Sequence, residues 1–405
     1  MRNFRDTARR EGWGPPFPDD EYKKRLGRVV EQMANVGIDT LLVTSPANIN
    51  YLTGYDMIWY YSRTPSAVAI RWEPISSLFF ELAYHRPTVE YHAVVDELTC
   101  FDSFHDADKF IVDELVRRSW HDGKVGIEFW SKNPNGQVLQ SITSGLEYSG
   151  TEIVDASWLV DNVKLIKSAA ECQAMHEAAK IADDAMLSVA SELKSGMTEI
   201  SIAGRILHQM MENGGGDPAI RVAVRSGPRF LARHCAPSLR KIQFGDLVWL
   251  NFCGSFHRYH SDLGRLVSIG EPDYRWTKLI DTASDIAADV LAGVKADEPT
   301  QKLQDSVEAA AERFGLSQQA VLLGGYDMGI AIPPDWVGHT FTNSERGFVK
   351  ADYVVGMCTN FEMLFRGQDD WRGGAGGGFI DTVVMTPTGL EVLSKIKRSI
   401  LIAGE

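Results

Sequence analysis

Two polar residues, Asn251 and Asp262, have a spacing that could place them in one site. They stand eleven residues apart, and the run from Leu247 to Phe252 has the mostly apolar composition of a buried strand. We expect two adjacent antiparallel strands whose side chains at these positions face one pocket. Whether that pocket holds a metal ion decides the function.

A histidine in a predicted loop is the candidate for proton transfer. His234 lies in SGPRFLARHCAP, whose glycine and prolines mark a loop. An imidazole titrates near neutral pH, so it can take a proton from water and then deliver it to a leaving nitrogen. The alternative is a loop histidine that is hydrogen-bonded to the backbone.

Two carboxylates are candidates for binding a positive charge. Glu362 interrupts the apolar segment CTNFEMLF, and Asp262 follows RYHS. A carboxylate in so apolar a strand needs a partner, because an unpaired buried charge is very costly. One such partner is a cationic amidinium or guanidinium, which a carboxylate binds through two parallel hydrogen bonds. The other is an internal salt bridge with Arg265 or Arg366, and Asp262 could also lie in an exposed turn.

The composition is that of a globular protein and argues against several classes of partner. With 405 residues, 44% of them hydrophobic, the chain can form two domains with cores of their own. Its net charge of −13 argues against nucleic acid and anionic membranes, which bind basic surfaces, but tolerates a cationic or zwitterionic substrate. We expect no membrane span and no signal peptide, since the long apolar runs they need are missing. Scattered cysteines without a C-x-x-C pair predict a reducing cytoplasm.

The hydrophobic pattern predicts two domains, with a boundary near residue 162. In the first, apolar strand candidates alternate with helices from Asp19 to Gly37, from 106 to 118 and from 134 to 146, which predicts an α/β sheet covered by helices. Residues 1–18 contain three prolines and are expected to form an extended arm that could lie on a partner subunit.

The second domain opens with a long amphipathic helix and carries the candidate site residues. A helix from Glu199 to Glu212 follows, then strands and two helices near 274–293 and 299–314. Two further strands are expected near 355–364 and 379–385. The whole chain is therefore expected to be of the mixed α/β (α+β) class, with the chemistry in its second half.

Several segments resemble, in their order along the chain, the creatinase and aminopeptidase P family. They are VKLIKSAAECQAMHEAAKIADDAM, GDLVWLNFCGSFHRYHSDLGRL, GGYDMGIAIPPDW, and VVGMCTNFE followed by FIDTVV; DTLLVTSPANINYLTGYD is similar to the family's N-terminal domain. The resemblance implies a creatinase-like α/β domain at 1–162, a C-terminal pita-bread catalytic domain (M24-like) at 163–405, and a homodimer. One fold hosts many chemistries, so the reaction must be inferred from the site.

The metal-dependent peptidases of this family hold two cations with two aspartates, a histidine and two glutamates. Carried over position by position, these five ligands fall on Asn251, Asp262, Tyr326, Glu362 and Ile380. Hard divalent cations need several anionic oxygens or imidazoles, which asparagine, tyrosine and isoleucine do not supply. The resemblance therefore implies no metal cofactor, although Asp262, Glu362, His260 and Asp381 could in principle hold a single ion.

Other segments resemble the metal-free branch of the family, creatinase and ectoine hydrolase. HCAPSLRKIQFGD is similar to creatinase, whose catalytic histidine stands at the same distance before a Gly-Asp pair and corresponds to His234. FHRYHSDLGRLV and GYDMGIAIPPDW are similar to ectoine hydrolase. YYSRTP resembles a creatinase segment whose arginine, here Arg63, reaches the substrate carboxylate of the neighbouring subunit.

Four more residues are expected at the pocket. Tyr326 could donate a hydrogen bond to a developing oxyanion, and Trp336 could form an apolar or cation-binding wall. His260 and His339 are placed there by position alone. Core packing is the alternative for Tyr326 and Trp336, and stacking on a neighbouring aromatic ring is the alternative for Arg63.

Together these observations predict a metal-independent, cofactor-free hydrolase of a non-peptide C–N bond. Its substrate would be a small zwitterion with an amidine, guanidino or cyclic amide group, such as ectoine or creatine. His234 would activate water, Glu362 and Asp262 would bind and polarise the cationic C–N group, and Arg63 would hold the carboxylate. The alternatives are a metal-dependent Xaa-Pro dipeptidase or aminopeptidase P-like enzyme, and a non-catalytic binding protein on the same fold.

Overall fold

The structure is a computed structural model that describes residues 2–58, 60, 63–336 and 351–403. The chain forms two compact units, Met1–Lys164 and Leu165–Glu405. The expected boundary at residue 162 lies inside the helix α7 (Leu159–Leu165), in which one unit ends and the other begins. The mixed α/β class is confirmed, because each unit contains its own sheet flanked by helices.

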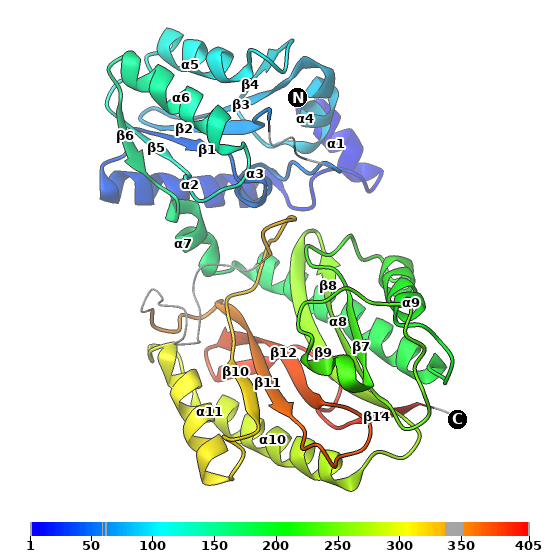
Figure 1. Cartoon of the computed structure of the whole chain (residues 1–405). Helices are drawn as coiled ribbons and strands as arrows, with labels where there is room; N and C mark the ends of the chain where they lie inside the picture. The colour runs from blue at the N-terminus through cyan, green and yellow to red at the C-terminus, as the bar shows by residue number, and fades with distance from the viewer. Residues whose placement is uncertain (1, 59, 61–62, 337–350, 404–405) are drawn as a thin grey trace. The chain divides into compact units, whose positions relative to one another are not determined.

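The N-terminal unit is built on a six-stranded mixed sheet in the order β4-β3-β2-β1-β5-β6. Its strands are β1 (Thr40–Val43), β2 (Ala67–Trp72), β3 (Ile75–Leu82), β4 (Glu97–Phe101), β5 (Lys124–Ile127) and β6 (Glu152–Asp155). Its helices are α1 (Arg2–Arg10), α2 (Asp19–Val36), α3 (Pro46–Thr53), α4 (Arg86–His92), α5 (Ala107–Arg117) and α6 (Gly136–Tyr148). Figure 1 shows α5 and α6 on one face of this sheet and α2 on the other.

The extended arm expected for residues 1–18 is wrong over Arg2–Arg10, which form the helix α1. Arg5 fixes this helix to its own unit, because its guanidinium donates to the carbonyl oxygen of Ala93 at 3.0 Å and to Asp19 at 3.1 Å. The ring of Phe4 packs edge-on against Tyr91 of α4, with centroids 5.3 Å apart. The prolines that suggested an arm all follow the helix.

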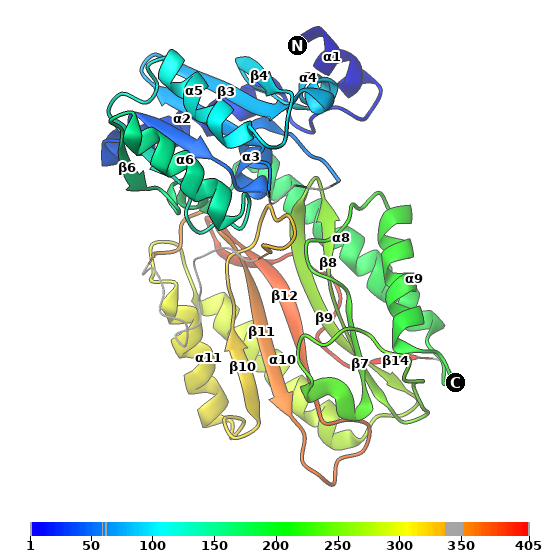
Figure 2. The same ribbon diagram turned by 45° about the horizontal axis from the view of Figure 1, so that its top comes forward.

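The C-terminal unit contains an eight-stranded sheet whose main path is β10-β11-β12-β9-β8-β7, with β13 paired to β12 and β14 to β9. The strands can be followed side by side from β10 to β7 in Figure 2. They are β7 (Ala223–Ser226), β8 (Leu247–Phe256), β9 (Tyr259–Ile269), β10 (Ala320–Gly324), β11 (Cys358–Arg366), β12 (Gly376–Thr386), β13 (Gly389–Val392) and β14 (Leu401–Ala403).

Two helix pairs build the cores of this unit. They are α8 (Ala169–Glu192) with α9 (Glu199–Glu212), and α10 (Tyr274–Gly293) with α11 (Gln301–Arg313). Apolar residues of α8 and α9 pack with those of β8 and β9, whereas those of α10 and α11 pack with β11 and β12. A capping box between Ser168 and Glu171 starts α8, because each side chain accepts the backbone N–H of the other residue.

The expected strand pair is confirmed as β8 and β9, which run antiparallel over their whole length. In this register Asn251 lies opposite Gly264, and Asp262 lies opposite Cys253. Since side chains alternate between the faces of a strand, Asn251 and Asp262 are diagonal neighbours on the same face of the sheet.

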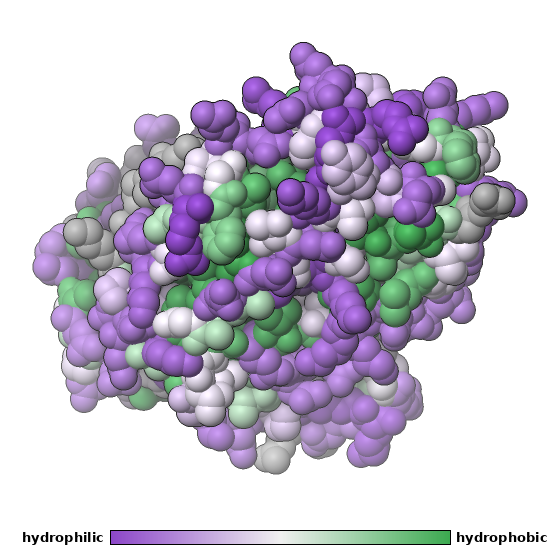
Figure 3. Space-filling view, turned by 90° about the horizontal axis from the view of Figure 1, so that it is seen from below, coloured by the Kyte–Doolittle hydropathy of each residue, from purple (hydrophilic) through white to green (hydrophobic). Residues whose placement is uncertain are grey.

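The surface visible in Figure 3 is mostly hydrophilic, with smaller apolar patches between the polar side chains. Within the part of the chain that the structure describes, no helix has both the length and the apolar composition needed to cross a bilayer.

The close contact between β8 and α8 depends on the absence of a side chain at Gly254. A Cβ atom at this position would lie 1.9 Å from the carbonyl oxygen of Ala178. We expect Gly254→Ala to lower the free energy of unfolding by roughly 3 kcal/mol, because overpacked cores must shift their backbone. Gly204→Ala in α9 is the control, since a Cβ there meets nothing within 4 Å. Thermal melts that show equal stability for both variants would contradict this packing.

Candidate active site

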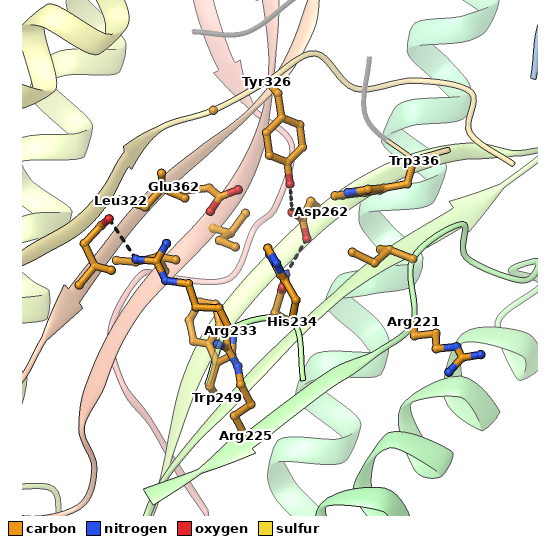
Figure 4. A pocket seen from close by; sticks show the side chains of 16 residues that line it. Arg221, Arg225, Arg233, His234, Trp249, Asp262, Leu322, Tyr326, Trp336 and Glu362 are labelled. Carbon is orange, nitrogen blue, oxygen red and sulfur yellow. Dashed lines mark hydrogen bonds between the residues drawn. The ribbon is translucent and has the colours of Figure 1, made fainter. Parts of the chain in front are cut away.

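A pocket of about 350 Å³ opens on the sheet of the C-terminal unit. All six strands from β7 to β12 contribute to its lining, together with the segment before β7, the loop before β8 and the segment after β10 (Figure 4). Its polar side chains are Arg221, Arg225, Arg233, His234, Asn251, Asp262, Tyr326 and Glu362. The structure thus brings His234, Asp262 and Glu362, the three predicted catalytic residues, to one pocket.

Asp262 is buried in this pocket among hydrogen-bond donors. Its Oδ1 accepts from Asn251 Nδ2 at 2.7 Å, and its Oδ2 accepts from Tyr326 OH and Asn360 Nδ2, both at 3.5 Å. Burial raises the pKa of Asp262 to about 6, although these hydrogen bonds favour the ionised form. Asp262 therefore does not lie in an exposed turn, which was one of the alternatives.

Glu362 is the second buried carboxyl group, with only 5% of the residue exposed. Its Oε1 accepts a hydrogen bond from Asn360 Nδ2 at 2.6 Å. Burial, and then repulsion by the charge of Asp262, raises the pKa of Glu362 to about 8. At neutral pH the two carboxyl groups therefore hold about one proton between them.

The predicted alternative of a salt bridge between Glu362 and Arg265 is wrong. The guanidinium of Arg265 instead donates to Asp381 Oδ1 at 2.6 Å, and Arg398 donates to Asp381 Oδ2 at 2.6 Å. Arg366 is exposed at the end of β11, and within the described parts of the chain it forms no ion pair with Glu362. Among the residues that the structure describes, no cationic side chain forms an ion pair with Glu362.

Asp381 is not a pocket residue, so its role as a ligand for a single ion is also wrong. It follows Ile380 in β12, and successive side chains of a strand point to opposite faces. Ile380 lines the pocket, whereas Asp381 is fully buried on the other side between its two arginines. Burial alone would raise the pKa of Asp381, but these arginines hold it below its ordinary value.

His234 enters the pocket from a loop that charged side chains hold in place. Its backbone has a φ of +57°, the left-handed region that non-glycine residues seldom adopt. The buried Glu199 accepts hydrogen bonds from the backbone N–H of Ser226 at 2.9 Å and of Ser238 at 3.0 Å, and it pairs with Arg229. Both ends of the loop are thereby anchored to α9.

The remaining predicted residues divide into those that reach the pocket and those that do not. Tyr326 and Trp336 line it, with ring centroids 5.6 Å apart. His260 does not line it: its Nε2 accepts the backbone N–H of Ala219 at 2.9 Å, and burial lowers the pKa of His260 to about 4. His339 lies outside the described residues, and Arg63 is an exposed residue of the N-terminal unit.

Sequence reasoning missed several polar residues of the site. Asn360 binds both carboxyl groups, and its position two residues before Glu362 on one strand was a usable signal. Arg225 and Arg233 also line the pocket but were not predicted to do so. The position of Arg225 depends on the pairing of β7 with β8, which no local sequence pattern indicates. Trp249 was predicted as part of a buried strand but not as a residue of the pocket lining.

The side chains that line the pocket do not fit the two-cation site of the metal-dependent peptidases. Asp262 and Glu362 are the only carboxylates in the pocket lining that the structure describes. Their neighbours Asn251, Asn360 and Tyr326 offer N–H and O–H donors, which stabilise a carboxylate and do not replace an anionic ligand. In the described ranges no three His, Cys, Asp or Glu residues gather in a group that could hold a metal ion.

Two family profiles match the chain. Residues 173–387 match metallopeptidase family M24, and residues 25–166 match the creatinase/prolidase N-terminal domain. The first match alone spans more than half of the chain.

Relatives with different activities align along nearly the whole chain. It is 25% identical over 407 residues to the ectoine hydrolase of Halomonas elongata, covering 96% of this chain and 98% of that protein. It is 23% identical over 403 residues to the creatinase of a Bacillus species, covering 94% and 92%. A dipeptidase from Pyrococcus horikoshii has a similar structure, with a TM-score of 0.80, 19% identity, and coverage of 93% and 99%. These matches confirm the family resemblance and the expected fold of both domains.

The shared proton of Asp262 and Glu362 predicts how stability depends on pH. The folded pKa of Glu362, about 8, lies above its ordinary value of 4.5, so the folded state binds the proton more tightly and loses stability as pH rises between these values. Glu362→Gln should remove this loss. Its free energy of unfolding should therefore exceed that of the natural chain by on the order of 2 kcal/mol near pH 8, but not near pH 4. Thermal melts over this range test it, and parallel pH profiles for both proteins would contradict it.

Proposed function

The chain belongs to metallopeptidase family M24, a family of hydrolases, and we propose that it hydrolyses a non-peptide C–N bond of a small zwitterion without a metal ion. One observation carries this proposal: the buried carboxyl pair of Asp262 and Glu362, surrounded by amide and phenol donors. Such a pair suits an organic cation, which two carboxylates can bind through parallel hydrogen bonds. The alignments with ectoine hydrolase and creatinase support the same reading.

The carboxyl pair binds and polarises the C–N group. An amidinium or guanidinium that enters the pocket favours the ionised form of Glu362, because it replaces the proton as the positive charge. Binding therefore releases a proton and orients the reacting carbon between the carboxylates and His234. Tyr326, whose pKa burial raises well above its ordinary value, keeps its phenolic proton and can donate to the developing oxyanion.

His234 performs the proton transfers of hydrolysis. It takes a proton from water as the water oxygen bonds to the substrate carbon, and it then delivers a proton to the nitrogen as the C–N bond breaks. The proton that water loses is the one the leaving amine gains, so the step consumes one water molecule and needs no other reactant. The left-handed backbone at His234 and the anchored loop support this fixed position.

The proposal also includes the oligomeric state of the chain and a role for Arg63. We propose a homodimer in which Arg63 helps to hold the substrate carboxylate, as its resemblance to the creatinase segment implies. Arg63 is exposed in the N-terminal unit, which leaves its guanidinium available for such a contact.

A metal-dependent Xaa-Pro peptidase is the second candidate, because residues 173–387 match a metallopeptidase family and an Xaa-Pro dipeptidase from Pyrococcus furiosus aligns over 94% of the chain. The two candidates differ in what activates water, and substrate profiling after metal removal separates them. We expect the EDTA-treated chain to hydrolyse ectoine, creatine or a related amidine and to leave Xaa-Pro dipeptides intact. An EDTA-treated protein that is inactive on all amidines, with Xaa-Pro cleavage restored by manganese, would establish the peptidase.

The proton-transfer role predicts the effect of replacing His234. His234→Asn keeps a residue that tolerates positive φ and should lower kcat by about a hundredfold or more, with little change in KM or thermal stability. His208→Asn, at an exposed position of α9, is the matched control and should retain full activity. If the His234 variant kept its kcat, the assignment of His234 would be wrong.

A further inference from the structure

A second polar cluster in the same pocket has donors that no group of the described residues uses. Arg225 and Trp249 both line the pocket, with 6% and 0% of the residue exposed. Among the residues that the structure describes, neither Arg225 Nε nor Trp249 Nε1 has a hydrogen-bond partner. Buried N–H groups are almost always paired, so two unpaired ones in one pocket point to a ligand.

Arg225 is held rigidly beside Trp249. The two residues face each other across the β7–β8 pair, and Arg225 Nη1 donates to the carbonyl oxygen of Phe230 at 2.7 Å. The guanidinium lies over the Phe230 ring, 5.1 Å from its centroid, and that ring packs edge-on against Trp249 at 5.5 Å. These contacts fix the direction of the guanidinium and leave its Nε unused.

Within the described parts of the protein, no carboxylate forms an ion pair with Arg225. The only hydrogen bond of its guanidinium there is to a neutral carbonyl. Burial lowers the pKa of Arg225 below its ordinary value, and the positive charge of Arg233 adds to this, whereas Cys235 and Glu362 act in the opposite direction without offsetting it. A buried cation of this kind is costly unless an anion joins it.

Arg233 brings a second guanidinium to the pocket, as Figure 4 shows. Its Nη2 donates to the carbonyl oxygen of Val321 at 3.0 Å, which ties the side chain to β10. The pocket is therefore bipolar: Asp262 and Glu362 are its acidic groups, and Arg225 and Arg233 are two of the three arginines that line it. A ligand that matches both must carry a positive and a negative charge.

We propose that Arg225, Trp249 and Arg233 form the subsite for the carboxylate of the substrate. This inference rests on the proposed function and deepens it, because both charges of the zwitterion are then bound within the C-terminal unit. The planar carboxylate accepts from Arg225 Nε and from the indole Trp249 Nε1, and Arg233 neutralises its remaining charge. Arg63 is then an additional contact and not the main carboxylate anchor.

The experiment uses acetate as a probe, because it carries the carboxylate alone and does not depend on catalysis. The full-length chain is labelled with ¹⁵N in its tryptophan indoles, and the Trp249 signal is assigned by its loss in Trp249→Phe. Titration with acetate at constant ionic strength should move the Trp249 Nε1–H signal downfield in a saturable way. Inorganic phosphate, titrated in parallel, should move it less, and an equal or tighter response to phosphate would overturn the assignment to a carboxylate.

Variants then identify the arginine that binds the anion. Arg225→Met should weaken acetate binding at least about tenfold, since a charge-assisted hydrogen bond is lost. Arg366→Met removes the same charge from an exposed position on β11 and should leave acetate binding unchanged. The other indole signals report whether each variant is folded. If acetate leaves the Trp249 signal in place, or moves it equally in Arg225→Met, the subsite is refuted, even in a protein that hydrolyses amidines.

Discussion

The cost of burying two carboxyl groups in one pocket determines the arrangement around them. Asp262 and Glu362 lie on the same face of one sheet, and burial raises the pKa of both. Their surroundings reduce this cost with hydrogen-bond donors from Asn251, Asn360 and Tyr326. The remaining cost is met by a proton on the pair, which an organic cation can replace. The substrate binding proposed here follows from the exchange of this proton for a cationic group.

The two faces of β12 differ in how buried carboxylates near them are neutralised. Asp381 is fully buried, yet two arginines bind both of its oxygens and lower its pKa. On the pocket side, the neighbouring Ile380 offers no charge, and Glu362 has no bound arginine among the described residues. A buried carboxylate that is paired with arginines, such as Asp381, gains little from a cationic ligand. A buried carboxyl group without such a pair, such as Glu362, favours one.

Local patterns predicted much of the fold, and long-range pairing explains what they missed. The helices at Glu199–Glu212 and Tyr274–Gly293 agree with the structure, because apolar periodicity and end signals are local. The partner of Asp381 could not be predicted, since Arg265 precedes it by more than a hundred residues. Arg225 was missed for the same reason: its place in the pocket depends on pairing with Trp249. The helix α1 was missed because the prolines that follow it dominated the pattern.

Direct titration of Glu362 tests most sharply whether the pocket binds an organic cation and not a metal. The carboxyl carbon of ¹³C-labelled glutamate, assigned through Glu362→Gln, reports its ionisation by NMR. In the free protein Glu362 should titrate near a pKa of about 8, and guanidinium should lower this pKa while magnesium or zinc should not. A pKa near the ordinary value of 4.5, or one that falls with the metal ion and not with guanidinium, would contradict the account.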